Sequence, residues 1–238
     1  MKRILLTGST GYLGRHILLL ADKKKYKIYE SNSKIGNLED IKNLYRYNKI
    51  KFDFIFHCAT KTKAGNYSQI YKGDQWLYNQ LINTNIMHYW KKYQSKAKMI
   101  AIGSSCMYSQ NYKMIEKNCL NGEVEKELYT YAMTKRMFYL GIKNFSEQYK
   151  LKYLFFIPSV LYGPNYDLTD RHFIFDFIRK INIGKKLNKE VEFFGSRNIK
   201  RDLIFVNDAV NNIFSLLKHN NEVFNLASGK EKTLIYYA

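Results

Sequence analysis

The stretch Thr7-Gly8-Ser9-Thr10-Gly11-Tyr12-Leu13-Gly14 decides the fold of this 238-residue chain. The apolar run Ile4-Leu5-Leu6 before it predicts a buried strand, and the apolar residues within 16–21 predict a helix. Glycines spaced in this way between a strand and a helix are typical of a dinucleotide site. Gly8 permits a tight turn, Gly11 lets backbone approach a pyrophosphate, and Gly14 lets the helix pack on the strand. We therefore expect a dinucleotide phosphate at the amino end of this helix.

The rest of the chain continues the alternation of strands and helices. Apolar patterns predict strands at 27–30, 53–59 and 98–103 and helices at 78–93 and 128–150. This alternation predicts an α/β fold with a doubly wound parallel sheet of Rossmann type. We expect a dinucleotide-binding domain at 1–162, a substrate-binding segment at 163–200, and a return to the first domain at 201–238.

Composition limits the classes of partner. The formal net charge of +19 raises nucleic acid as a partner, but the lysines are scattered along the chain and no nucleic-acid-binding motif accompanies them. We expect no nucleic acid, and a basic surface that attracts phosphorylated small molecules. No apolar run is long enough to cross a bilayer, so we expect no membrane association and a cytoplasmic protein. The three cysteines lack metal-ligand spacing, which predicts reduced thiols and no metal site.

The end of the second predicted strand bears on the choice of cofactor. A carboxylate there would hold the adenosine ribose hydroxyls and repel a phosphate. The neutral residues Ser31, Asn32 and Ser33, followed by Lys34, instead favour NADP. NAD stays the alternative, because a shift of one residue would bring Glu30 to the ribose. We place Asn37 and Leu38 beside the adenine.

A candidate acid/base pair lies in the helix predicted at 128–150. Helical spacing puts Tyr131 and Lys135 on one face, a single turn apart. A phenol titrates near pH ~10 in water, and an ammonium one turn away is expected to lower that pKa by favouring the phenolate. Tyrosine and lysine are abundant here, so the pair alone is weak evidence for catalysis.

The motifs taken together resemble the extended short-chain dehydrogenase/reductase superfamily, also called the NAD-dependent epimerase/dehydratase superfamily. The resemblance rests on the glycine-rich start, on Ser104 at the end of a central strand, on Tyr131-x-x-x-Lys135, and on the later segments 156–164 and 201–208. Almost the whole chain is covered. The resemblance implies that the cofactor contacts Gly8, Thr10, Gly11, Tyr12, Leu13, Gly14, Ser31, Asn32, Ser33, Asn37, Leu38, Cys58, Ala59, Thr60, Tyr131, Lys135, Pro158 and Val160.

Within that superfamily the run Gly103-Ser104-Ser105-Cys106-Met107-Tyr108 is similar to the GDP-L-fucose synthase family. That similarity implies that Ser104 joins Tyr131 and Lys135 in reduction, and that Cys106 and His172 carry out epimerisation. It also implies substrate contacts from Ser105, Lys180, Phe194 and Arg201.

The resemblance implies an NADPH-dependent epimerase and reductase of a nucleotide-activated 4-keto-6-deoxy sugar, with a GDP-sugar favoured and a GDP-heptose relative left open. Alternatives are a 4-epimerase or 4-reductase without epimerisation at the flanking carbons, and a cofactor-binding protein without turnover. The last arises because the chain stops at Ala238 where the family continues, so we expect a small, incomplete substrate lobe. We also expect a homodimer.

Overall fold

The computed structural model describes residues 1–23, 26–167, 172–193, 196 and 198–237. The helices and strands in chain order are β1 (Arg3–Thr7), α1 (Tyr12–Lys23), β2 (Lys27–Ser31), η1 (Ile41–Tyr47), β3 (Phe54–His57), α2 (Tyr67–Ile70), α3 (Lys72–Tyr93), β4 (Lys98–Ile102), η2 (Ser105–Met107), η3 (Glu116–Asn118), η4 (Lys126–Leu128), α4 (Tyr129–Tyr149), β5 (Tyr153–Pro158), β6 (Val160–Tyr162), α5 (Phe173–Leu187), β7 (Lys200–Phe205), α6 (Val206–Ser215), η5 (Leu216–Lys218), β8 (Glu222–Leu226), β9 (Glu231–Thr233) and α7 (Leu234–Tyr237), where η marks a 3-10 helix.

The main sheet has six strands in the order β2-β1-β3-β4-β5-β8. Every neighbouring pair in it is parallel. β2 lies on one side of β1 and β3 on the other, so the direction in which strands are added reverses at β1. The predicted α/β fold with a doubly wound parallel sheet is therefore confirmed.

Side chains of the central strands alternate between two apolar layers, as the pleat of a strand requires. In β1, Leu5 belongs to one layer, whereas Ile4 and Leu6 belong to the other. The same alternation separates Phe155 from Phe156 in β5. Both faces of the sheet are thus buried, which explains why these strands read as continuous apolar runs.

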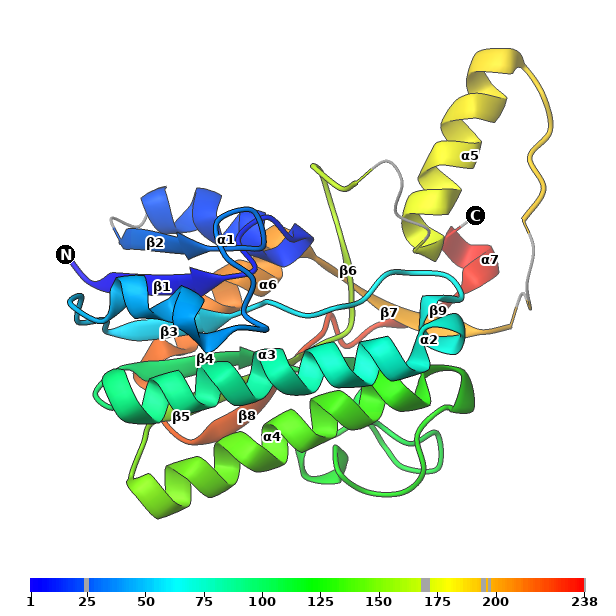
Figure 1. The fold of residues 1–238 in the computed structure, drawn as a ribbon. Helices are drawn as coiled ribbons and strands as arrows, with labels where there is room; N and C mark the ends of the chain where they lie inside the picture. The colour runs from blue at the N-terminus through cyan, green and yellow to red at the C-terminus, as the bar shows by residue number, and fades with distance from the viewer. Residues whose placement is uncertain (24–25, 168–171, 194–195, 197, 238) are drawn as a thin grey trace.

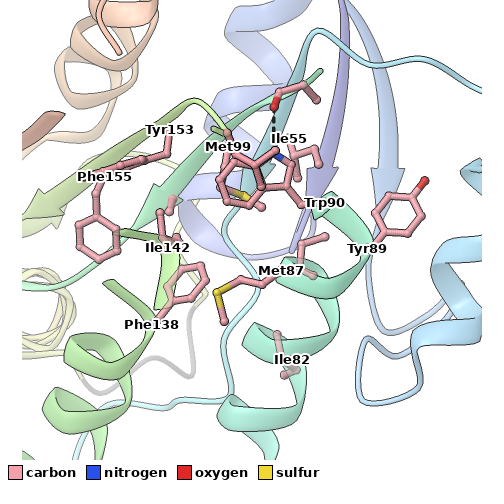
Figure 2. Packing of buried hydrophobic residues seen from close by; sticks show 14 of the residues in the cluster. Ile55, Ile82, Met87, Tyr89, Trp90, Met99, Phe138, Ile142, Tyr153 and Phe155 are labelled. Atoms are coloured by element: carbon pink, nitrogen blue, oxygen red, sulfur yellow. Dashed lines mark hydrogen bonds between the residues drawn. The ribbon is translucent and has the colours of Figure 1, made fainter. Parts of the chain in front are cut away.

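Helices cover the two faces of the sheet (Figure 1). α3 and α4 lie side by side over one face, while α1 and α6 pack on the other. Figure 2 shows how the first layer is filled: Met87 of α3 points toward Phe138 of α4, and Trp90 of α3 lies beside Met99 of β4. The Trp90 indole is fully buried and donates a hydrogen bond of 2.8 Å to the carbonyl oxygen of Ala97. Such burial contributes about 2–3 kcal/mol per large apolar side chain.

A second, smaller sheet forms at the carboxyl end of the first. β6 pairs with β7 in parallel, and β7 pairs with β9 in antiparallel fashion. Next to it Ile174, Phe175 and Leu203 form a separate small core, with α5 and α7 beside each other in Figure 1. The division of the chain at residues 162 and 200 stays a prediction, although β6 takes part in this second sheet.

Candidate active site

The residues predicted to bind the cofactor gather along one edge of the main sheet. Gly8 follows β1, Ser31 ends β2, Cys58 follows β3, Ser104 follows β4, and Pro158 ends β5. Because the strands are parallel, all these carboxyl ends meet at the same edge. We call this the carboxyl edge. It is where ligands of open parallel sheets bind.

The turn between β1 and α1 has the geometry of a dinucleotide cradle. Gly8 has a φ of +70°, and a Cβ placed on it would lie 2.6 Å from the backbone nitrogen of Ala59. A Cβ on Gly14 would lie 2.2 Å from the carbonyl oxygen of Gly8. Only glycine fits either position, so the first turn of α1 is brought against the turn with its backbone amides open to an anion. The residues present therefore fit a dinucleotide.

The end of β2 lies against this cradle. The amide of Gly8 donates 2.8 Å to the carbonyl oxygen of Ser31, and the Asn32 side chain donates 2.9 Å to the Ser9 hydroxyl. Ser33 and Glu30 are exposed, and Tyr47 donates to the carbonyl oxygen of Glu30. Of the pair placed beside adenine, Asn37 is exposed, whereas Leu38 is buried in the core. A neutral amide thus stands nearest the glycine turn.

Tyr131 and Lys135 face each other on α4. The Lys135 ammonium lies 5.8 Å from the centre of the Tyr131 ring and donates 2.9 Å to the carbonyl oxygen of Ile102. Burial raises the pKa of the Tyr131 phenol, the Cys106 charge raises it further, and the Ser104 hydroxyl lowers it. The expectation of a lowered pKa was wrong for this structure, because burial raises the pKa by more than the Ser104 hydroxyl lowers it. The phenol therefore holds its proton at neutral pH.

Two thiols border the same ammonium. Burial lowers the pKa of Lys135 to about 8, and the charges of Cys58 and Cys106 oppose that shift. Burial raises the pKa of Cys58 to about 12, with Lys135 acting in the opposite direction. Ser104, Cys58, Cys106, Tyr131 and Lys135 therefore form one cluster at the carboxyl edge.

Two charged residues from other parts of the chain affect the pKa of the Cys106 thiol. Burial raises the pKa of Cys106, the Ser104 hydroxyl lowers it, Glu125 raises it, and Arg201 lowers it. Arg201, one of the predicted substrate contacts, is on β7 of the second sheet. Glu125 precedes η4, and the motifs had not singled it out.

The two remaining small-lobe residues have partners of their own. His172 precedes α5, and its ring contacts Phe173 and Phe175, so its pairing with Cys106 stays a prediction. Lys180 lies 3.7 Å from an Asp176 carboxylate oxygen and donates 3.0 Å to the carbonyl oxygen of Glu192. Phe194 lies outside the described residues.

The remaining predicted cofactor and substrate contacts differ in how far they are exposed to solvent. Thr10 is exposed, Tyr12 is half-buried, and Leu13 packs in the core. The half-buried positions that follow strands or lie in the second sheet are Ala59, Thr60, Ser105 and Val160.

His57 is a member of the cluster that the sequence analysis had not selected. Its ring lies 2.8 Å from the Thr7 hydroxyl through Nδ1 and 3.3 Å from Asn83 Oδ1 through Nε2. Burial lowers its pKa to about 3, and the Lys135 charge lowers it further. His57 is therefore neutral at ordinary pH and adds no positive charge beside Lys135.

The loop between β4 and α4 is held by hydrogen bonds from α4 and β8. Arg136 donates to the carbonyl oxygens of Met107, Asn121 and Gly122, and Asn225 of β8 contacts Tyr108 and Met114 of the same loop. Nothing in the spacing of the sequence marks Arg136, since it is one cation among many. Its position directly after Lys135 was the only signal.

The described residues provide neither a metal site nor a membrane span. They contain no group of three or more His, Cys, Asp or Glu side chains that could hold a metal ion. Within the same part of the chain, every helix is too short or too polar to span a bilayer.

Comparison with known proteins gives consistent matches along the chain. The model of the NAD dependent epimerase/dehydratase family matches residues 4–227. A GDP-L-colitose synthase of Yersinia pseudotuberculosis is 28% identical over 250 residues, covering 99% of this chain and 79% of the relative. A GDP-L-fucose synthase of Dictyostelium discoideum is 28% identical over 216 residues, covering 87% of this chain and 67% of the relative. A GDP-L-fucose synthetase from Naegleria fowleri bound to NADP has the same fold, with a TM-score of 0.83 and 23% identity over 100% of this chain and 76% of that one.

Proposed function

The chain belongs to the NAD dependent epimerase/dehydratase family, and on that premise we propose that it is an NADPH-dependent epimerase and reductase of a nucleotide-activated 4-keto-6-deoxy sugar. The observation that carries the proposal is the single cluster of Ser104, Cys106, Tyr131 and Lys135 at the carboxyl edge. Ser104, Tyr131 and Lys135 suit reduction, and the Cys106 thiol suits proton transfer beside a ketone. The names of the relatives favour a GDP-sugar.

Reduction needs an acid for the carbonyl oxygen. Tyr131 keeps its proton in the resting protein because burial raises its pKa, so it is ready to donate one. Lys135, with a pKa lowered by burial to about 8, is mostly an ammonium at neutral pH and stabilises the phenolate that donation leaves. Ser104, whose hydroxyl acts on the same phenol, would hydrogen-bond the carbonyl oxygen as charge develops there. Bound NADPH would supply the hydride.

Epimerisation needs proton removal and return next to the ketone. Protons on those carbons are acidic because the enolate spreads charge onto oxygen, and inversion requires two groups on opposite faces. We assign Cys106 and His172 to these roles. Arg201, whose charge acts on Cys106, is suited to hold the diphosphate of the substrate near that thiol. Lys180, Ser105 and Phe194 keep their proposed substrate contacts.

The cofactor is proposed to be NADP in preference to NAD. Asn32 beside Ser9 offers a neutral donor at the position where an NAD-binding protein places a carboxylate. A structure of similar fold carries NADP. The cytoplasmic location expected from the sequence stays a prediction.

We further propose a homodimer formed through α3 and α4. Both helices expose large apolar side chains: Trp76 is 52% exposed, Leu81 38%, Met137 48% and Leu140 39%. The two helices lie side by side (Figure 1), so a second copy packed on this pair of helices would cover exposed side chains of both. Exposed apolar surface of this kind marks an interface between proteins.

A 4-reductase without epimerisation is the second candidate. The small lobe that carries His172 has its own core, and the ring contacts of His172 are with Phe173 and Phe175. Loss of the second proton-transfer group from the site would leave reduction intact. Product stereochemistry separates the two candidates.

The decisive experiment supplies GDP-linked 4-keto-6-deoxy sugars and NADPH in heavy water. Cys106→Ser is expected to abolish deuterium incorporation beside the ketone while cofactor binding persists. Tyr131→Phe is expected to stop NADPH consumption while exchange persists. Tyr129→Phe, which alters an exposed phenol on the same helix, serves as the control. If Cys106→Ser left deuterium exchange untouched, the epimerase assignment would be wrong.

A further inference from the structure

We propose that Arg136 is a positioning residue for Cys106, acting through the loop 108–122 whose two ends it holds together. The inference rests on the proposed function, since it concerns the thiol assigned to proton transfer. It is carried by hydrogen bonds that join one buried guanidinium to both ends of the loop.

Arg136 lies on α4 directly after Lys135, and its side chain is buried. Nε donates 2.8 Å to the carbonyl oxygen of Met107, the residue that follows Cys106. Nη1 donates 2.7 Å to the carbonyl oxygen of Gly122, and Nη2 donates 2.8 Å to that of Asn121. One planar guanidinium group therefore binds backbone at both ends of the loop.

Burying a cation is costly unless its donors are satisfied. Burial lowers the pKa of Arg136, as expected for a charge removed from water. Its recorded acceptors are the three carbonyl oxygens, and no carboxylate is among the hydrogen bonds that the described residues make to it. Because the guanidinium group is rigid and planar, it holds its three acceptors in one plane.

A second attachment restrains the middle of the loop. Asn225 on β8 accepts 2.8 Å from the Tyr108 hydroxyl and donates 2.9 Å to the carbonyl oxygen of Met114. Its backbone amide donates 2.9 Å to a Glu116 carboxylate oxygen. The loop is therefore held at its middle by β8 and at its two ends by Arg136, which leaves it little freedom to move.

The turn around Cys106 has little freedom of its own. The Cys106 amide donates 3.3 Å to the Ser104 hydroxyl, and the next side chain, Met107, is fully buried. On the other side, Glu125 follows Gly122 by one short segment, and its carboxylate acts on the Cys106 thiol. The Arg136 clamp therefore holds the turn that carries the thiol, through the carbonyl oxygen of the next residue.

The test follows the accessibility of Cys106, which needs no sugar substrate. The full-length chain is treated with iodoacetamide near neutral pH, and mass spectrometry measures the modification rate of each cysteine. In Arg136→Lys we expect Cys106 to react about tenfold faster, because a looser loop hydrates the thiol and brings its pKa toward the ordinary value. Cys58, which follows β3 outside the loop, is expected to react at an unchanged rate.

A second variant changes the same loop and leaves the Arg136 side chain unaltered. Gly122 has a φ of +64°, and a Cβ there would lie 2.7 Å from the Tyr112 ring and 2.9 Å from the Ser109 hydroxyl oxygen. Gly122→Ala is thus expected to displace the carboxyl-terminal end of the loop. The rate at which iodoacetamide modifies Cys106 should therefore rise in this variant as well. Lys143→Met, on an exposed position of α4, is the control and should change neither thiol.

The outcomes separate this inference from the proposed function. If folded Arg136→Lys and Gly122→Ala both left the Cys106 rate at the wild-type value, the clamp would not position Cys106. Equal acceleration of Cys58 and Cys106 would mean general loosening and would also overturn the inference. If Arg136→Lys failed to fold, Gly122→Ala would decide. With an accepted substrate, both variants should lower deuterium incorporation by about a hundredfold while cofactor binding persists.

Discussion

The Lys135 ammonium lies 5.8 Å from the centre of the Tyr131 ring and gives its 2.9 Å hydrogen bond to the carbonyl oxygen of Ile102. The Ile102 carbonyl oxygen holds the ammonium near the neutral phenol, and no ion pair is formed. At neutral pH the pair rests as a neutral phenol beside a cation, because burial raises one pKa and lowers the other. The Tyr131 side chain thus becomes negatively charged only when it gives its proton to an acceptor.

The buried ammonium predicts a rise in stability between about pH 7 and pH 9. The pKa of Lys135 is about 8 in the folded protein against an ordinary 10.5. As pH rises through about 8, the folded protein loses this proton before the unfolded chain does, so the free energy of unfolding rises by about 1 kcal/mol. Urea unfolding should show the rise in wild type but not in Lys135→Met. An identical rise in both proteins would contradict it, and exposed Lys143→Met is the control.

His57 predicts a loss of stability in mild acid. Its pKa is about 3 in the folded protein against an ordinary 6.5. As pH falls below 6.5, the unfolded chain takes up a proton that the folded protein excludes, so the free energy of unfolding falls. From about pH 7 to about pH 5 the loss is about 2 kcal/mol. His57→Gln should flatten that slope, whereas His88→Gln, at an exposed position, should retain it.

Gly14 predicts a specific effect on cofactor binding. A methyl group there would lie 2.2 Å from the Gly8 carbonyl oxygen, so Gly14→Ala must push α1 away from the cradle. Calorimetry should show NADP affinity reduced by at least about tenfold, equal to about 1.4 kcal/mol. The matched control is Gly73→Ala on α3, where an added Cβ meets nothing within 4 Å. A Gly14→Ala protein that bound NADP as tightly as the control would refute the cradle.

Asn32 predicts the direction of cofactor preference. Wild type should bind NADP more tightly than NAD in calorimetric titrations. Asn32→Asp should weaken NADP by about tenfold, because a carboxylate beside Ser9 repels a ribose phosphate. Tighter binding of NAD by wild type, abolished in Glu30→Gln, would instead show that Glu30 reaches the ribose.

The exposed surface of α3 and α4 predicts a change in oligomeric state. Leu140→Lys should shift sedimentation toward the monomer, because a charge placed in an apolar interface is desolvated without a partner. Leu19→Lys changes a leucine that is 54% exposed on α1 and should leave assembly unchanged. A wild type that sediments as a monomer at all concentrations would remove the dimer proposal.

Much of the fold follows from periodicity in the sequence. The apolar runs of β1, β3 and β4 predicted the sheet, and the family resemblance is confirmed. α3 begins at Lys72, earlier than predicted, because its first turn is polar and offers no apolar period. The short strands β6 and β9 were missed for a similar reason, since half-exposed three-residue strands carry almost no alternation.

The site shows a different limit. Spacing placed Tyr131 and Lys135 together, but it gave the wrong direction for the phenol's pKa, because depth of burial is set by elements distant in sequence. Likewise Arg136 and Asn225 meet one loop from a helix and from the last strand of the main sheet. No local pattern encodes a contact that depends on tertiary structure alone.

β8 completes the main sheet by pairing with β5, from Leu154 opposite Glu222 to Pro158 opposite Leu226. During synthesis on a ribosome, β5 emerges long before its partner does. Until then its outer edge presents unpaired backbone groups flanked by Phe155 and Phe156, which is a template for pairing with another nascent chain. Slow synthesis of residues 159–221 would therefore lengthen the time during which this edge is open to another chain.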